Sequence, residues 1–185
     1  MDKTKRFSVT DAGKNDPIVF DQIFAEKVGG GLVKNSPFDL YPGTAVSEDG
    51  NVIKAYKVVE DAADNATSIK IAKNSGIALG DVIAKGKVGV ACTAVDTTTS
   101  ADFDTVTVTL GAAVSKGDVL YQAASASTSS SPAAPIHTPK YLLGEFVEAN
   151  SGDELVKLVN GANIRKETAP VADEVVALMK SIEKI

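Results

Sequence analysis

The chain has one imidazole and one thiol that could take part in nucleophilic catalysis: His137 is the single histidine and Cys92 the single cysteine. A Ser-His-Asp or Cys-His site would have to recruit His137. That residue stands in "PAAPIHTPK", directly after a low-complexity stretch that would not hold it in place. The sequence also contains no G-x-S-x-G motif, Walker loop or G-x-G-x-x-G motif. We therefore expect a protein that is not an enzyme.

Metal ions and carried cofactors have no convincing ligands either. One histidine and one cysteine cannot form a structural zinc site within the chain. The acidic pairs at 61 and 64 and at 102 and 104 could give oxygens to Ca²⁺, but the spacing of an EF-hand is absent. The stretch "VSKGDVL" at 114–120 is similar to turns of biotinyl and lipoyl carrier domains, yet their Met-Lys-Met and Asp-Lys-Ala tripeptides are missing. We expect no cofactor and no metal.

The composition limits the partners of the chain. With 44% hydrophobic and 23% charged residues, its 185 residues are typical of a folded protein. The formal net charge of −5, with lysines dispersed among acids, argues against nucleic-acid binding, which needs a concentrated basic face. No stretch approaches the roughly 18 consecutive apolar residues of a membrane span, and "MDKTKRFSVTDAGK" lacks the apolar segment of a signal peptide. We expect no nucleic-acid or membrane partner, and a protein that stays soluble in the cell that makes it.

The elements that must carry any site are predicted to be strands. Runs rich in β-branched residues and separated by Gly, Asp and Asn are expected at 51–59, 68–72, 87–95, 105–110, 140–149 and 154–164. A Gly-Asp corner followed by Val occurs twice, in "LGDVIAKG" at 79–86 and "KGDVLYQA" at 116–123, and each copy is expected to lead the chain into a sheet. The predicted fold class is mainly β: a small antiparallel barrel or sandwich, tulip-like, with an extended N-terminal arm and a short C-terminal helix.

The positions of the stretches rich in Gly, Pro and Ser predict four segments. These are an N-terminal arm at 1–36, a β-rich module at 37–122, a Ser/Ala/Pro-rich linker or loop at 123–139, and strands plus a helix at 140–185 that complete the module. The arm carries apolar side chains that suggest docking onto a partner, although they could equally cover the module's own core: Ile18, Phe20, Ile23 and Phe24.

The last eighteen residues are expected to form the helix. Thr168 could cap it, Pro170 fits its first turn, and lysines at 180 and 184 suit its negative end. The apolar positions recur at steps of four and three, which is typical of a heptad stripe: Val171, Val175, Leu178, Ile182 and Ile185. This stripe would pack either on the chain's own sheet or along a seam with symmetry mates.

Several stretches together resemble the head-fibre and head-decoration (auxiliary capsid) proteins of tailed bacteriophages. They are "PGTAVSEDGNVIKAYKVVEDA" at 42–62, the two Gly-Asp corners, and "LVNGANIRKETAPV" at 158–171. The resemblance implies a noncatalytic, β-rich structural protein on the outer surface of an icosahedral capsid, commonly a trimer, with one terminal region attached to the shell. The implied partners are the major capsid protein and further copies of the chain, and the implied location is the virion, after synthesis in the host cytoplasm. A long shaft is missing, which favours a compact decoration protein.

A carbohydrate- or cell-surface-binding β module is the alternative interpretation. Sugar-binding surfaces usually expose Trp or Tyr for stacking. The chain has no tryptophan and four tyrosines, at 41, 56, 121 and 141, which counts against this alternative.

Overall fold

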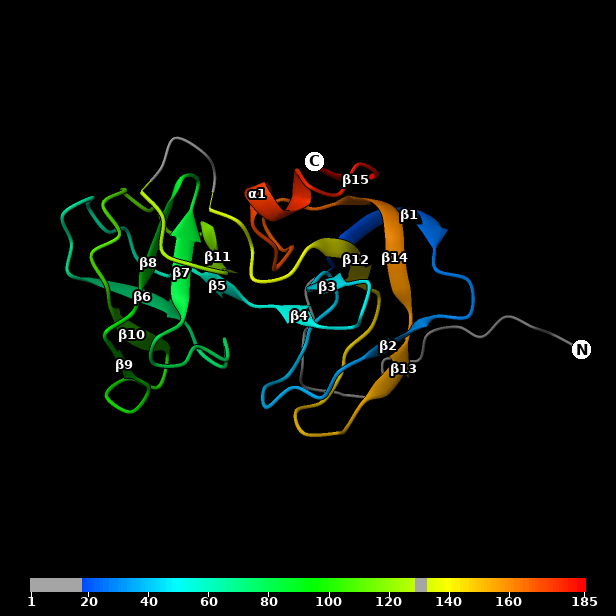
Figure 1. Cartoon of the computed structure of the whole chain (residues 1–185), viewed down its shortest axis with the longest axis horizontal. Helices are drawn as coiled ribbons and strands as arrows, with labels where there is room; N and C mark the ends of the chain where they lie inside the picture. The colour runs from blue at the N-terminus through cyan, green and yellow to red at the C-terminus, as the bar shows by residue number, and fades with distance from the viewer. Residues whose placement is uncertain (1–17, 129–132) are drawn as a thin grey trace, which may run out of the picture.

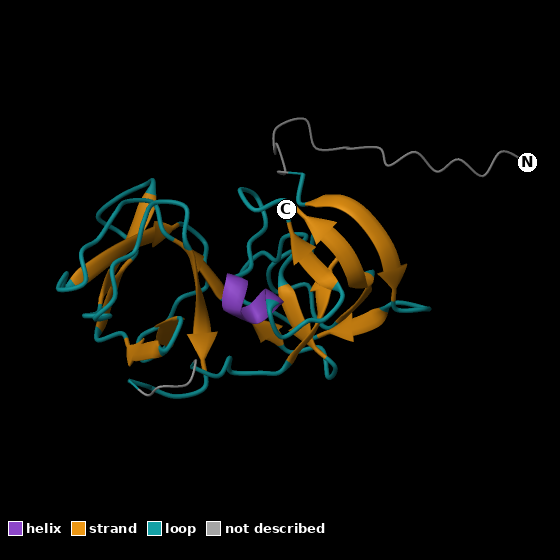
Figure 2. Ribbon diagram, turned by 90° about the horizontal axis from the view of Figure 1, so that it is seen from above, coloured by secondary structure: helices purple, strands orange, loops and turns teal. Residues whose placement is uncertain are grey.

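The computed structural model describes residues 18–128 and 133–185, which form two β lobes joined by a short helix (Figure 1). The right lobe in Figure 1 contains β1 (Phe20–Glu26), β2 (Gly31–Val33), β3 (Ala45–Ser47), β4 (Val52–Ile53), β12 (Pro139–Leu143), β13 (Glu154–Val156), β14 (Leu158–Ile164) and β15 (Ile182–Lys184). The left lobe contains β5 (Ala55–Lys57), β6 (Ser68–Ala72), β7 (Val82–Lys85), β8 (Val88–Ala91), β9 (Ala94–Asp96), β10 (Phe103–Thr107) and β11 (Val119–Ala123). The helix α1 (Asp173–Val176) lies between the lobes (Figure 2).

The predicted fold class is confirmed. The chain is mainly β, with several antiparallel sheets arranged like a sandwich and one short helix near the C-terminus. Within the described ranges the sheets do not close into a barrel. No helix in this part of the chain is long and apolar enough to cross a membrane.

The left lobe buries the side chains that strand alternation points inward. Ile69 and Ile71 of β6 are buried, and so are Val106, Val108 and Leu110 in and after β10. Two sheets, with strand orders β6-β10-β9 and β5-β11-β7-β8, pack around this core. The expected run at 51–59 divides between the lobes, because β4 pairs with β3 whereas β5 pairs with β11.

The two Gly-Asp corners have the same local structure. Gly80 and Gly117 adopt φ values of +87° and +96°, a region that favours glycine. In each corner the aspartate N–H donates to the carbonyl three residues earlier, and its carboxylate accepts the N–H of that same residue. The corners lead into β7 and β11, which are neighbours in one sheet. The sequence repeat therefore marks two equivalent corners of one lobe.

The right lobe draws its strands from both ends of the described chain. β14 pairs antiparallel with β1 on one side, and on its other side with β12 and, in parallel, β15. The predicted arm at 1–36 is wrong for its second half, because β1 and β2 are built into the lobe, and residues 1–17 lie outside the described residues. The residues between β11 and β12 connect the two lobes, and their ends are held by bridges from Ala123 to Pro135 and from Gly89 to Ser127. The structure has two lobes in place of the single β module that residues 140–185 were expected to complete. In the sequence, the left lobe is inserted between β4 and β12 of the right lobe.

The predicted helix over 168–185 is wrong beyond its short central turn. Ala172 is the N-cap of α1, whereas the Thr168 hydroxyl donates to the carbonyl of Ile18. Residues 182–184 form β15 instead of a last helical turn. The physical reason is that β14 offers an open edge at Ala162–Ile164, and pairing there suits the β-branched Ile182 better than a helix does.

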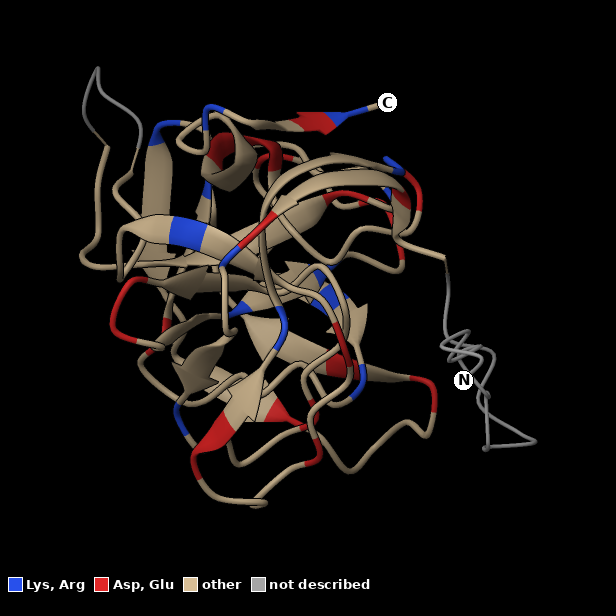
Figure 3. Ribbon diagram, turned by 90° about the vertical axis from the view of Figure 1, so that its right-hand side faces the viewer, with Lys and Arg blue, Asp and Glu red and all other residues tan. Residues whose placement is uncertain are grey.

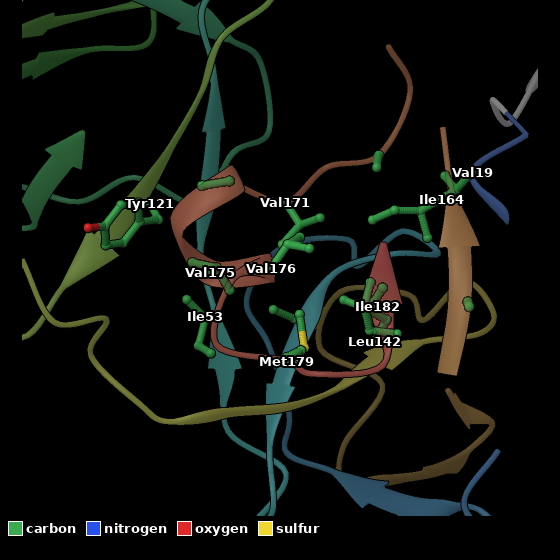
Figure 4. Packing of buried hydrophobic residues seen from close by; sticks show 14 of the residues in the cluster. Val19, Ile53, Tyr121, Leu142, Ile164, Val171, Val175, Val176, Met179 and Ile182 are labelled. Atoms are coloured by element: carbon green, nitrogen blue, oxygen red, sulfur yellow. The ribbon is translucent and has the colours of Figure 1, made fainter. Parts of the chain in front are cut away.

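The C-terminal residues join the two lobes. A central cluster contains Val171, Val175 and Ile182 together with Tyr121 of the left lobe and Leu142 of the right lobe (Figure 4). Glu174 of α1 accepts the backbone N–H of Gly86, at the β7–β8 turn, at 2.6 Å. Three of the five stripe residues are thus core of the chain itself, whereas Leu178 and Ile185 are exposed.

Candidate docking surface

The eight predicted contact residues do not form one site. Val171, Val175 and Ile182 are buried in the central cluster, which removes them from any seam with symmetry mates. The partly buried Phe20 and Ile23 pack against the same cluster. Three of the eight are exposed: Ile18, Phe24 and Leu178.

Phe24 is one of four exposed apolar side chains on β1, β2, β13 and the β1–β2 connection. We name this set the end patch: Phe24 of β1, Val28 of the β1–β2 connection, Leu32 of β2 and Leu155 of β13. Val28 is 99% exposed and Leu155 72% exposed, and the other two side chains are more than half exposed. Leu32 and Leu155 are register partners, so their side chains lie together on one face. Val28 and Leu155 also line one hollow, so at least three of the four exposed side chains are neighbours, and contiguous exposed apolar side chains often mark an interaction site.

The backbone presents Val28 on a looped-out segment. Glu26 pairs with Val159 and Gly31 with Val156, so four residues, 27–30, stand opposite only two, 157 and 158. The bulge pushes Val28 outward, and Gly30 closes it at φ +73°. A Cβ on Gly30 would lie 2.6 Å from the Val156 carbonyl oxygen, so only glycine fits. The "GGG" run thus forms a defined bulge.

A hollow of about 460 Å³ lies beside this bulge, with Val28, Leu155 and charged groups in its wall. Lys157 forms an ion pair with Glu26 at 2.6 Å, and its backbone N–H donates to Glu145 at 2.6 Å. Acidic and basic residues are interspersed over this end of the molecule (Figure 3). An apolar centre with a mixed polar rim is typical of a protein–protein interface.

The side chain of Lys27, the first residue of the bulge, has two partners. The Lys27 ammonium lies 3.6 Å from Glu48 and 4.9 Å from the centre of the Tyr141 ring. The hydrogen bond that the Tyr141 hydroxyl donates lowers the pKa of Glu48, and the charges of Lys27 and Lys140 lower it further. Glu48 is therefore ionised at neutral pH and can pair with Lys27.

Three of the residues considered for chemistry have structural partners: Cys92, Asp61 and Asp104. Cys92 is buried, and its thiol donates to the Ala78 carbonyl at 3.1 Å. Asp61 accepts the N–H of Lys116, and Asp104 pairs with Lys73 at 2.7 Å. Across residues 18–128 and 133–185, no cluster of three or more His, Cys, Asp or Glu side chains could hold a metal ion.

The sequence contained a usable signal for half of the end patch. In "GLV" and "ELV", alternation directs the middle leucine away from the side on which Val33 and Val156 are buried. That Leu32 and Leu155 lie side by side depends on the pairing of β2 with β13, which no local pattern reveals.

Comparison with protein-family models, curated proteins and solved structures found no match for this chain.

Proposed function

We propose that the chain is a noncatalytic structural protein that binds the outer surface of a phage capsid, as a head-fibre or decoration protein, and that it acts as a homotrimer. The end patch is the observation that carries this proposal. Three of its four side chains come from residues 1–36, the terminal region whose apolar side chains suggest docking onto a partner. The partner is the major capsid protein, and the complex resides on the virion.

The size of the patch is consistent with attachment that depends on several copies. Burial of one such side chain contributes about 1.5–3 kcal/mol, while association costs about 4–15 kcal/mol. Four partly exposed side chains therefore give weak binding for one copy. Three linked copies bind much more tightly, because the second and third contacts form within one complex. The trimer that the resemblance implies would supply this gain.

Binding to phage heads tests the proposal. Heads prepared without the chain are mixed with the purified protein and sedimented, and the bound amount is measured for the unchanged chain and for Leu155→Lys. The matched control is Leu79→Lys, since Leu79 is 71% exposed but lies on the left lobe, outside the end patch. We expect Leu155→Lys to lose at least tenfold in occupancy and the control to bind normally. Equal occupancy for both variants would refute attachment through the end patch.

Two further measurements complete the test. Light scattering on the free protein is expected to give the mass of three copies, and a monomer that also fails to sediment with heads would overturn the proposal. Deletion of residues 1–17 tests the remainder of the arm. It is expected to leave the fold intact, because Val19 and β1 remain in place, whereas deletion of 1–30 would remove β1 and unfold the right lobe.

A further inference from the structure

A cleft of about 350 Å³ lies at the junction of the two lobes, away from the end patch. Its walls include residues 38–42 and 52 of the right lobe, residues 55, 57 and 72–75 of the left lobe, and residues 168 and 170 of the C-terminal segment. Ligand sites occur preferentially at such junctions, and this volume falls within the range of small-molecule sites.

The cleft holds the one tyrosine that is available for stacking. Tyr56, Tyr121 and Tyr141 are buried, whereas Tyr41 is partly exposed and lines the cleft beside Phe38. The Tyr41 ring is held by Phe146, with centroids 5.4 Å apart. The Phe38 ring packs on Gly76, where an added Cβ would lie 2.2 Å from a ring carbon. Both rings are therefore fixed before a ligand arrives.

Three lysines line the cleft, and one of them forms no salt bridge with the described residues. Lys54 pairs with Asp81 at 2.9 Å, and Lys73 pairs with Asp104. The Lys57 ammonium instead donates to the backbone carbonyl of Glu167 at 3.1 Å, and it forms no salt bridge with any described residue. A carboxylate on a ligand would supply the opposite charge for Lys57.

We propose that this cleft binds a sugar ring that carries one carboxylate. The apolar face of the ring packs on Tyr41 and Phe38, and the carboxylate pairs with Lys57. The ring hydroxyls face the polar side chains of Asp39, Asn74 and Thr168 in the cleft wall. A purely apolar acid would bring no hydroxyls to the Asn74 amide, and covering that amide without a hydrogen-bond partner would be costly.

Glucuronate and glucose form the matched pair of probes, because they differ only at the carboxylate. Binding to the full chain is followed by NMR chemical-shift titration, and a small sugar of this size is expected to have a Kd of about 1 mM. We expect glucuronate to bind roughly tenfold more tightly than glucose. Lys57→Met should abolish that preference, while Lys87→Met, outside the cleft, should preserve it. Tyr41→Ala should weaken both sugars, and Phe103→Ala is its aromatic control outside the cleft.

Several binding results would refute this site. Equal binding of both sugars, or a preference that survives Lys57→Met, would overturn the role of the carboxylate. Tighter binding of benzoate than of glucuronate would show that the cleft selects an apolar acid instead of a sugar. Shifts confined to residues outside the cleft, or no binding by either sugar, would reject the site altogether. Thermal melting of each variant separates loss of binding from loss of fold, and none of these outcomes depends on capsid attachment.

Discussion

Removal of the Asp81 carboxylate should destabilise the protein far more than removal of its counterpart Asp118. Both residues occupy the same position of the repeated Gly-Asp corner, so Asp81→Ala and Asp118→Ala remove the same group from the same turn. Their surroundings differ. Asp81 accepts hydrogen bonds from the Lys54 ammonium at 2.9 Å, the Tyr56 hydroxyl at 3.0 Å and the Gln122 amide at 3.0 Å.

The expected magnitudes follow from burial. The Asp81 and Lys54 side chains are 12% and 21% exposed, and Tyr56 is fully buried, so Asp81→Ala leaves a cation and a hydroxyl without acceptors in a largely dry site. Such a loss costs about 3–5 kcal/mol. Asp118 pairs with Lys85, and both side chains are about one-third exposed, so water replaces the lost partner and the cost is about 1 kcal/mol.

Urea unfolding of the two variants measures this difference. Both residues belong to the left lobe, so one transition reports on both. With a slope of about 2 kcal/mol per molar urea, the midpoint of Asp81→Ala should fall by about 1.5–2.5 M and that of Asp118→Ala by about 0.5 M. Equal losses would mean that the shared turn, and not the buried hydrogen bonds, determines the contribution of the aspartate. The reasoning from burial would then be refuted.

Three further predictions concern the junction of the lobes. Val175→Ala should lower the free energy of unfolding by about 1.5–3 kcal/mol in thermal or urea melts, whereas Leu178→Ala, at an exposed position, should change it by less than about 0.5 kcal/mol; the reverse order would restore the heptad seam. Gly76→Ala should destabilise the protein more than Gly80→Ala in the same melts, because both need a positive φ but only the Cβ at Gly76 would meet an aromatic ring at 2.2 Å; equal effects would show that the ring moves away freely. Burial, followed by a nearby glutamate charge, raises the pKa of Tyr121 to about 12, so the unfolded chain loses this proton from about pH 10 while the folded chain retains it, and stability should fall between these values. Tyr121→Phe should show a smaller fall in this window when denaturant midpoints are compared across pH, and an unchanged fall would assign it to other groups.

The strands could be predicted where alternation was strict. In β6 the sequence "SIKIA" directs Ile69 and Ile71 to one face, and the structure buries both. The Gly-Asp corners were also readable, because a turn with positive φ leaves a local chemical signature. These features depend on neighbours within a few residues of each other.

The C-terminal segment and the end patch could not be predicted in the same way. Spacings of four and three fit a helical stripe, but Ile182 lies in a strand because the edge of β14 is open there, and that edge is defined by residues far away in the sequence. Likewise, Phe20 and Ile23 were left open between docking and core, and only the pairing of β1 with β14 places them against the central cluster. The positions of these residues depend on strand pairing between segments far apart in the sequence, which local patterns do not reveal.

The pairing of β1 with β14 also sets an order of events during translation. The left lobe is one contiguous segment, so all its strands have left the ribosome before β14, the partner strand of β1, is made. β1 stays unpaired until β14 is made, and the lobes do not pack together until α1 and β15 have also left the ribosome. Until that moment the nascent chain displays an unpaired, apolar strand near its N-terminus, which is the stage at which a chaperone, or a neighbouring nascent copy, has access to it.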